Sequence, residues 1–513
     1  MPQIFRFMFK RTLLAAMASV ALFAACDKEK EKEEVIPVSF SSFGFYAKDN
    51  ADVLKTDYIV DNVTSDAISF TIPYGTDPEA LKSLVPEFTV TEGASVNVAD
   101  ASGAPDGKDI VSGVTAVDFS SPVQLVVFLK NNFKAYSVTV KIAEPAKWGK
   151  VAESALGVKS DPVFAVSPKD GAIYVAGSSP NAEGVAEPHL FKLDGSELKD
   201  VAGALAATNS DYFAVDICPD GTPYVSFLDK GVKKQCVMKV SGSKAELVGA
   251  ADALYLTSGS SNSAVGLFAL SASDIWCAQY NNERKVLVER RALNLAHFDG
   301  SAWTNAISIP GRNAKDYAYC ILGKYVAGVP YLFIYNQNTQ SISLYKYASN
   351  AWSAVFESLK VKKADGTTDA TLNLRAFDFD IATNGDIYVM AGGDYSVEKV
   401  YNLAVVKIAA KDNAQTIIGG EMSVDIDKYR SASMGLDAND VPYVVYTKPE
   451  GDVKYACITT IDPKAKTWTE GEKLSSNPSD FVVIRFTDNG LGYVVSKETI
   501  GENTKYVLYS TAE

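Results

Sequence analysis

A short phrase that recurs along the chain places the strongest limit on its fold. It reads "KDGAIYV" at 169–175, "PDGTPYV" at 219–225, "TNGDIYV" at 383–389 and "DNGLGYV" at 488–494. Each copy looks like the end of one strand, a tight turn and the start of the next strand. Asn-Gly and Asp-Gly pairs favour such turns because they tolerate positive φ. The phrase therefore predicts a series of similar β-hairpins.

The aromatic residue near the end of the phrase shows how many copies there are. It recurs seven times, with gaps of 50, 52, 55, 57, 55 and 50 residues, at Tyr174, Tyr224, Trp276, Tyr331, Tyr388, Tyr443 and Tyr493. This period is too long for helical repeats of about 33–34 residues and suits a four-stranded propeller blade. We expect seven blades, with these aromatic residues packed inside them.

The two ends of the repeat region predict how the ring closes. The last unit stops at its third strand, "VLYSTAE", with no fourth strand after it. Residues 146–156, "AKWGKVAESAL", are similar to the outer-strand segment "NAWSAVFESLK" at 350–360. We expect 146–156 to supply the outer strand of the seventh blade, starting at Trp148, so that no open edge remains. The propeller then spans 145–513.

Residues 36–144 predict a separate β module. In "DAISFTIPYG", Ile68, Phe70 and Ile72 alternate with polar residues, as in a strand with one buried face. Turn signals every 8–15 residues suggest a β-sandwich of about immunoglobulin size. The predicted fold class is therefore all-β, an immunoglobulin-like β-sandwich followed by a seven-bladed β-propeller.

The N-terminus reads as a targeting segment. Residues 1–25 carry basic residues, then a short apolar run, then small residues directly before Cys26. This order resembles a lipobox, which implies lipidation of Cys26 and a membrane contact through that anchor. Residues 26–35 contain "DKEKEKEE", which cannot pack and predicts an extended tether. An ordinary cleaved secretory signal with a chance cysteine is the alternative.

Three features resemble those of known protein groups. The repeated phrase is similar to the blade signature of NHL-type propellers. The wording "IPYGTDPEALKSLVPEFTVTEGASV" resembles immunoglobulin-like modules near the N-terminus of Bacteroidota surface lipoproteins. The acidic run after Cys26 resembles their surface-export signal. These resemblances imply a surface-exposed, lipid-anchored protein of the outer membrane, although the interleaved lysines leave retention in the inner leaflet open.

Composition excludes several functions. The net charge is −13, with no basic patch that could hold a phosphate backbone, so nucleic acid is not an expected partner. The two histidines, His189 and His297, fall at different places in their repeats and are not expected to converge. We predict no catalytic residue, no cofactor and no metal site. The five cysteines after Cys26 are scattered and odd in number, which favours small buried side chains over disulfides.

Candidate ligand-binding residues stand where the inner strands begin, thirteen residues before the repeated aromatic. The charged ones are Asp161, Asp211, Arg375, Arg430 and Asp480, with Asp316 the equivalent in the fourth unit, and the aromatic neighbours are Tyr212, Tyr317 and Phe481. We expect the long loops 176–188, 278–291 and 390–402 on the same face. The pattern predicts a polar funnel rimmed by aromatic side chains. The alternative is a set of salt bridges and strand caps around a water-filled channel.

The expected function is noncatalytic binding of an extracellular glycan or protein on this loop face. The glycan follows from the resemblance to nutrient-capture lipoproteins. Two alternatives stay open. One is a glycan hydrolase or lyase that uses the funnel carboxylates as acid and base. The other is a scaffold or adhesin that binds protein there.

Overall fold

The computed structural model describes most of the chain downstream of residue 36. It covers 37–100, 102–254, 265–280, 293–307, 309, 318–396, 402–422, 424, 431–487 and 489–511, with the side chains of 319 and 373–375 excepted. Cys26, the leader at 1–25 and the tether at 26–35 lie outside the described residues. Within these ranges no helix is long and apolar enough to cross a membrane.

The first module is a β-sandwich of two sheets. One sheet has the order β2 (Tyr58–Val60), β1 (Phe40–Phe45), β4 (Glu87–Val90). The other has the order β3 (Ala67–Ile72), β8 (Asn132–Ile142), β7 (Val123–Leu129), β5 (Ser95–Ala99), β6 (Pro105–Asp109). A short 3₁₀ helix, η1 (Pro78–Ser83), lies between β3 and β4. The predicted alternation in β3 is confirmed, because Ile68, Phe70 and Ile72 are all buried.

The core of the sandwich is aromatic. Phe40, Phe43 and Phe45 project from β1 and are almost fully buried. The rings of Phe45 and Phe119 meet edge to face with their centroids 5.0 Å apart. Edge-to-face contact suits the ring quadrupole and adds to the hydrophobic gain from burial.

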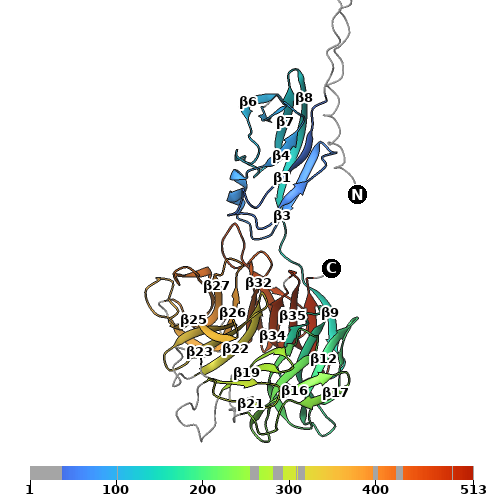
Figure 1. Ribbon diagram of the computed structural model, residues 1–513, viewed down its shortest axis with the longest axis vertical. Coiled ribbons are helices and arrows are strands. Elements are labelled where there is room, and N and C mark those ends of the chain that lie inside the picture. The colour runs from blue at the N-terminus through green and yellow to red at the C-terminus, as the bar shows by residue number, and fades with distance from the viewer. Residues whose placement is uncertain are drawn as a thin grey trace, which may run out of the picture.

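The second module is the predicted seven-bladed propeller (Figure 1). Blade 1 consists of β10 (Val163–Val166), β11 (Ile173–Pro180), β12 (Ala186–Asp194) and β13 (Glu197–Asp200). Blade 2 consists of β14 (Ser210–Ile217), β15 (Pro223–Asp229), β16 (Lys234–Ser241) and β17 (Lys244–Leu247). Blade 3 consists of β18 (Gly266–Ser271), β19 (Asp274–Tyr280), β20 (Leu293–Phe298) and β21 (Trp303–Thr304). Blades 4 and 5 consist of β22 (Ala318–Val326), β23 (Val329–Asn336), β24 (Ser341–Ala348) and β25 (Ala351–Leu359); and β26 (Thr371–Ile381), β27 (Ile387–Asp394), β28 (Asn402–Ile408) and β29 (Gln415–Met422). Blade 6 consists of β30 (Ala432–Leu436), β31 (Pro442–Glu450), β32 (Val453–Thr460) and β33 (Glu472–Lys473), and blade 7 of β34 (Ser479–Phe486), β35 (Gly492–Ile500), β36 (Asn503–Ser510) and β9 (Gly149–Ser154).

Strand β9 closes the ring as predicted. It pairs antiparallel with β36, where Ala152 faces Leu508. Its other edge pairs parallel with β13 of blade 1, so blades 7 and 1 share one eight-stranded sheet. Trp148 precedes the strand and packs against Tyr443 and Phe486, with ring centroids 6.2 and 5.9 Å away. The N-terminal strand of the propeller therefore completes its C-terminal blade.

The repeated phrase forms the hairpin between the first two strands of a blade, as expected. Gly171 and Gly385 occupy these turns with φ of 71° and 86°, which a residue with a Cβ adopts at a cost. Five of the seven repeated aromatic residues are buried, whereas Tyr331 and Tyr493 are half-buried. Their role in blade packing is confirmed.

The five described cysteines that follow the leader are free. Cys218, Cys277, Cys320 and Cys457 are buried and Cys236 is half-buried. The expectation of small buried side chains is therefore confirmed.

The two faces of the propeller differ. The hairpin face carries the turns between first and second strands and between third and fourth strands. The sandwich sits on this face (Figure 1): the Tyr74 hydroxyl donates to the Ile461 carbonyl over 2.8 Å, and Lys466 lies 2.8 Å from Asp77. The loop face, where inner strands begin and second strands end, points the other way.

Two of the loops expected on the loop face are shorter than predicted. β11 continues to Pro180 and β12 begins at Ala186, so much of 176–188 is strand. β27 likewise continues to Asp394 inside the expected loop 390–402. The reason for β11 is that Ser178 and Ser160 bond reciprocally, each backbone N–H donating to the other's Oγ at 3.1 and 2.8 Å. Their polar groups can therefore lie buried in a regular strand.

Charged side chains from the inner strands of several blades meet near the hairpin face. Lys324 Nζ lies 2.6 Å from Asp378 Oδ1, and Arg485 lies 3.2 Å from Asp378 Oδ2. Burial alone would raise the pKa of Asp378, but the two cations outweigh it and lower that pKa. Asp378, in blade 5, thereby links Lys324 of blade 4 with Arg485 of blade 7.

Candidate functional site

Three acidic side chains approach one another at the loop face of blades 7, 1 and 2. Asp161 lies two residues before β10, Asp211 lies in β14 and Asp480 lies in β34. Lys497 Nζ, from β35, lies 2.6 Å from Asp161 Oδ1 and 3.3 Å from Asp480 Oδ1. These distances put the two carboxylate oxygens within about 6 Å of each other, the range of paired carboxyls in sugar-processing sites. One lysine therefore bridges acids from two neighbouring blades.

The third acid has its own lysine. Lys230 Nζ lies 3.0 Å from Asp211 Oδ2. The negative charges of Asp480 and Asp211 both raise the pKa of Asp161, after the larger effect of burial. Since such effects fade with distance, the three carboxylates share one electrostatic environment. We call Asp161, Asp211, Asp480, Lys230 and Lys497 the acid–lysine cluster.

The cluster combines exposed acids with a covered lysine. The side chains of Asp161 and Asp480 are 57% and 65% exposed, whereas that of Lys497 is 10% exposed. Desolvation nevertheless is the largest cause of the raised pKa of Asp161. Burial would lower the pKa of Lys497, but Asp161 and Asp480 raise it, so this lysine stays charged.

Backbone irregularity aims these side chains. The register of β14 shifts between Asp211 and Ala214, and Tyr212 within that bulge has a φ of 52°. The register of β34 shifts between Ser479 and Phe481. β22 and β26 carry similar shifts at the same end. Bulges redirect side chains and recur beside functional sites, and a tyrosine with positive φ stores local strain.

A buried support lies beneath Asp161. The Tyr506 hydroxyl donates to the Ser160 carbonyl over 3.0 Å. A Cβ on Gly177 would lie 1.9 Å from the Tyr506 oxygen, so only glycine fits there. Tyr506 from blade 7 therefore fixes the turn that presents Asp161 from blade 1.

The remaining predicted residues divide into three groups. Tyr212 is half-buried within the cluster region, whereas Phe481 packs against the core of blades 7 and 1 instead of forming a rim. The backbone of Arg375 lies in β26, but its side chain is outside the described part of the chain. Asp316, Tyr317 and Arg430 also lie outside the described residues.

Sequence reasoning missed both lysines of the cluster. Lys497 lies four residues after the repeated Tyr493, and Lys230 six residues after Tyr224. Second strands end on the loop face, so the repeat that located the acids could also have located these cations. The acids share one place in the repeat, at the starts of the inner strands, whereas the lysines lie at the ends of the second strands.

The arrangement suits hydrogen bonding to hydroxyl groups. Exposed carboxylates accept hydrogen bonds and the ammonium groups donate them, and these charged pairs are stronger than neutral ones. The described residues contain no group of three or more His, Cys, Asp or Glu side chains able to hold a metal ion.

Comparison with known proteins finds a family for part of the chain. Residues 54–140, within the sandwich, match the family model described as "SGBP, N-terminal", where SGBP denotes surface glycan-binding protein. No curated protein matches the chain.

Several solved structures share part of the fold at low similarity. A mutant of the Aleuria aurantia lectin in complex with Fucα1-6GlcNAc has a TM-score of 0.35 and 13% identity, covering 58% of this chain and 94% of the lectin. A fungal alcohol oxidase in complex with copper has a TM-score of 0.43 and 12% identity, covering 72% and 76%. Puromycin hydrolase has a TM-score of 0.40 and 10% identity, covering 70% and 52%. These structures are too distant to bear on function, and the similarity to a surface glycan-binding family covers residues 54–140.

Proposed function

We propose that the protein is a noncatalytic, surface-exposed lipoprotein that binds an extracellular glycan through the acid–lysine cluster on the loop face of its propeller. The observation that carries this proposal is the convergence of Asp161, Asp211 and Asp480 with Lys497 and Lys230 in one solvent-open region.

The chemistry of the cluster fits carbohydrate. Sugar hydroxyls donate and accept at once, so alternating carboxylate and ammonium groups can satisfy them in pairs. Half-buried Tyr212 adds an aromatic surface beside Asp211. The family match of residues 54–140 supports glycan as the ligand class.

The order of modules suits capture outside a cell. We propose a leader at 1–25, a lipid on Cys26, a tether over 26–35, the sandwich over 36–144 and the propeller over 145–513. The sandwich contacts the hairpin face, so the loop face is directed away from the anchored end (Figure 1). A membrane-anchored chain would thus present the cluster to the medium.

A glycan array with matched variants tests the proposal. The chain without residues 1–26 is applied as the parent protein and as Asp161→Asn/Asp480→Asn, which keeps side-chain size but removes two charges. The control is Asp194→Asn/Asp412→Asn, which removes two charges from exposed positions at hairpin-face turns. We expect binding to one glycan class, roughly tenfold or more weaker in the cluster variant and unchanged in the control.

Two results would contradict the proposal. Absence of binding to any glycan would direct the search to protein partners on the loop face. Release of shorter sugars from the bound glycan, lost in the cluster variant, would instead identify an enzyme that uses the Asp161–Asp480 pair.

A further inference from the structure

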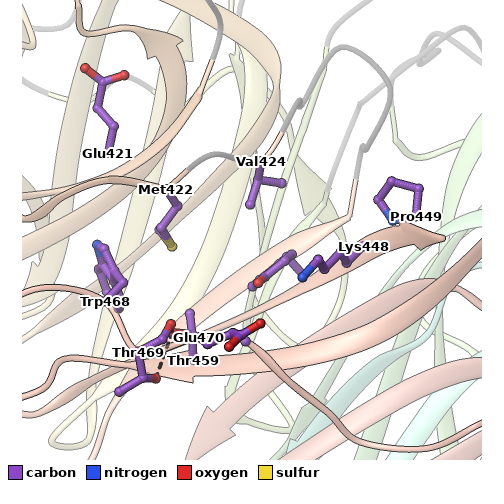
Figure 2. A pocket seen from close by; sticks show the side chains of 11 residues that line it. Glu421, Met422, Val424, Lys448, Pro449, Thr459, Trp468, Thr469 and Glu470 are labelled. Atoms are coloured by element: carbon purple, nitrogen blue, oxygen red, sulfur yellow. Dashed lines mark hydrogen bonds between the residues drawn. The ribbon is translucent and has the colours of Figure 1, made fainter.

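A pocket opens on the rim of the propeller between blades 5 and 6, away from the acid–lysine cluster. Its volume is about 420 Å³, enough for a single sugar ring with room for bound water. β29 of blade 5 supplies one wall, and blade 6 supplies the other through β31, β32 and the segment at 468–471. Figure 2 shows Trp468 and Met422 along one side and Lys448 and Pro449 along the other.

The pocket lining combines apolar surface with a few polar groups. Trp468, Met422 and Tyr446 supply apolar area, and Glu470 and Thr459 supply oxygen atoms. A pyranose ring has an apolar face of C–H groups and a girdle of hydroxyls, so it needs both kinds of surface.

Trp468 is held in place before any ligand arrives. Its indole Nε1 donates to the carbonyls of Ile418 and Gly420 over 3.1 and 3.2 Å. Gly419, with a φ of 68°, lets the backbone of β29 approach the ring, because a Cβ there would lie 2.8 Å from Trp468 Nε1. A fixed aromatic surface loses little entropy on binding.

Tyr446 presents its phenolic hydroxyl at the pocket wall, where it is open to a ligand. Only 7% of Tyr446 is exposed, and none of the described residues hydrogen-bonds its phenolic oxygen. The oxygen reaches the pocket wall because residue 471 is glycine, where a Cβ would lie 2.1 Å from it. Burial, with smaller effects from Cys457 and Glu470, raises the pKa of Tyr446 to about 12, so the group stays protonated and able to donate.

The same junction between blades 2 and 3 provides an internal comparison. Trp303 there occupies the place of Trp468, and its Nε1 donates to the Val248 carbonyl over 2.8 Å. Two residues later, Asn305 donates to the Ala253 carbonyl over 2.6 Å and accepts from Asn294 over 2.9 Å. This asparagine ties the two blades together and closes the junction.

At blades 5 and 6 the closing contact is replaced. The residue two positions after Trp468 is Glu470, which is exposed and has no hydrogen bond or ion pair to any described residue. The tryptophan is therefore a repeated link between blades, and at blades 5 and 6 the pocket lies beside it. A structural role for Trp468 alone does not account for Glu470 and Tyr446.

We propose that this rim pocket is a second carbohydrate site that takes one neutral sugar ring, with Trp468 against its apolar face and Tyr446 and Glu470 hydrogen-bonded to its hydroxyls. The choice of carbohydrate rests on the proposed function, but the residues are independent of the loop face. Glu421 and Glu470 disfavour an anionic sugar. A long glycan could then be held at two places on one molecule, which raises the overall affinity without new contacts at either site.

Small neutral glycosides provide the test. The chain without residues 1–26 is titrated with methyl glycosides of glucose, galactose, mannose and xylose, followed by saturation-transfer NMR and by tryptophan fluorescence. We expect one or more of them to bind and to change the fluorescence. Tyr446→Phe and Glu470→Ala should each weaken that binding roughly tenfold, the usual effect of one lost hydrogen bond to a ligand.

Two control variants separate the possible results. Tyr455→Phe removes the same atom from the same blade outside the pocket and should bind as the parent does. Asp161→Asn/Asp480→Asn should also retain glycoside binding. If it does, and its array binding is as strong as that of the parent chain, the loop-face proposal is wrong and the rim site stands. Failure of all four glycosides to bind, or binding that neither pocket variant weakens, overturns the rim site. Glu470→Ala alters an exposed residue, so it decides the matter even if Tyr446→Phe unfolds.

Discussion

Acidic residues on the inner strands serve two purposes, depending on depth along the strand. Asp216 and Asp378, near the hairpin face, are buried and accept backbone N–H bonds from the next blade, from Ala269 at 2.6 Å and from Met434 at 3.1 Å. Asp161 and Asp480, at the loop face, have exposed side chains. The deep acids hold blades together, and only the shallow ones are available to a ligand.

Asp216 makes the stability of the fold depend on pH. Burial raises its pKa to about 7, although three donors, among them the Tyr325 hydroxyl at 3.1 Å, favour the charged form. The folded state thus binds the proton more tightly than the unfolded state does. The stability that protonation of Asp216 contributes is complete below about pH 4. It is lost as the pH rises through about 7, and the free energy of unfolding then falls by up to roughly 4 kcal/mol. Urea unfolding between pH 5 and 8 measures it.

The same series on Asp216→Asn isolates the effect of this carboxyl from that of the other titratable groups. We expect a smaller dependence on pH in this variant. Asp194→Asn, which alters an exposed acid, should leave the dependence as in the parent. A slope unchanged in Asp216→Asn would show that other groups cause it.

Among the elements, β9 is short but joins two blades. Six residues join two blades, because one edge pairs with β36 and the other with β13. Ala152, in the middle, is 1% exposed and belongs to the core shared by blades 1 and 7. Without this strand both blades would have open edges.

Ala152→Pro should therefore destabilise the ring strongly. Proline removes a ladder N–H and clashes inside a strand that is paired on both sides, at a cost of about 3 kcal/mol or more. Chemical unfolding gives the change in free energy. Lys147→Pro, just before the strand, should cost far less, and equal losses in the two variants would mean that β9 does not close the ring.

On the scale of the whole molecule, the sandwich and the propeller meet through a small, specific contact. Tyr74, Asp77 and Lys55 reach the hairpin-face turns of blade 6, and Lys55 pairs with Asp440. Gly75 has a φ of 92°, and a Cβ there would lie 2.3 Å from a Val441 methyl. The contact depends on the absence of a side chain at this position.

Gly75→Ala should separate the two modules without unfolding either. The added methyl collides with Val441 and strains the backbone, by about 1–3 kcal/mol together. We expect small-angle X-ray scattering to report a larger radius of gyration, with sheet content unchanged by circular dichroism. Gly103→Ala, at a φ of 84° with no atom near the new Cβ, imposes the same backbone strain in the sandwich alone. An unchanged radius in Gly75→Ala would show that the contact tolerates the methyl group.

The repeat made most of the fold predictable, and some of the site. Residues such as Tyr174 and Gly171 recur at one period, so strand order, blade number and the closing strand at 146–156 followed from spacing alone. The acids Asp161, Asp211 and Asp480 share one place in that period, so their common face followed too. The sequence analysis expected Phe481 at a rim and did not single out Lys497. Spacing along the chain does not show which side chains a bulge redirects or which ones meet across blades.

By itself, the amino-acid sequence determined the all-β class, the seven blades, the ring closure and the face on which the acids lie, because local turn chemistry and a constant period are properties of the chain. Only the tertiary structure decided which lysines pair with those acids, that Asp216 and Asp378 bind neighbouring blades, and that a pocket opens beside Trp468. The bonds of Asp216 to Ala269, of Asp378 to Met434 and of Trp468 to Ile418 each join residues about fifty positions apart, and Lys497 and Asp161 are farther apart still. Such contacts depend on packing between blades, which no local pattern in the sequence records.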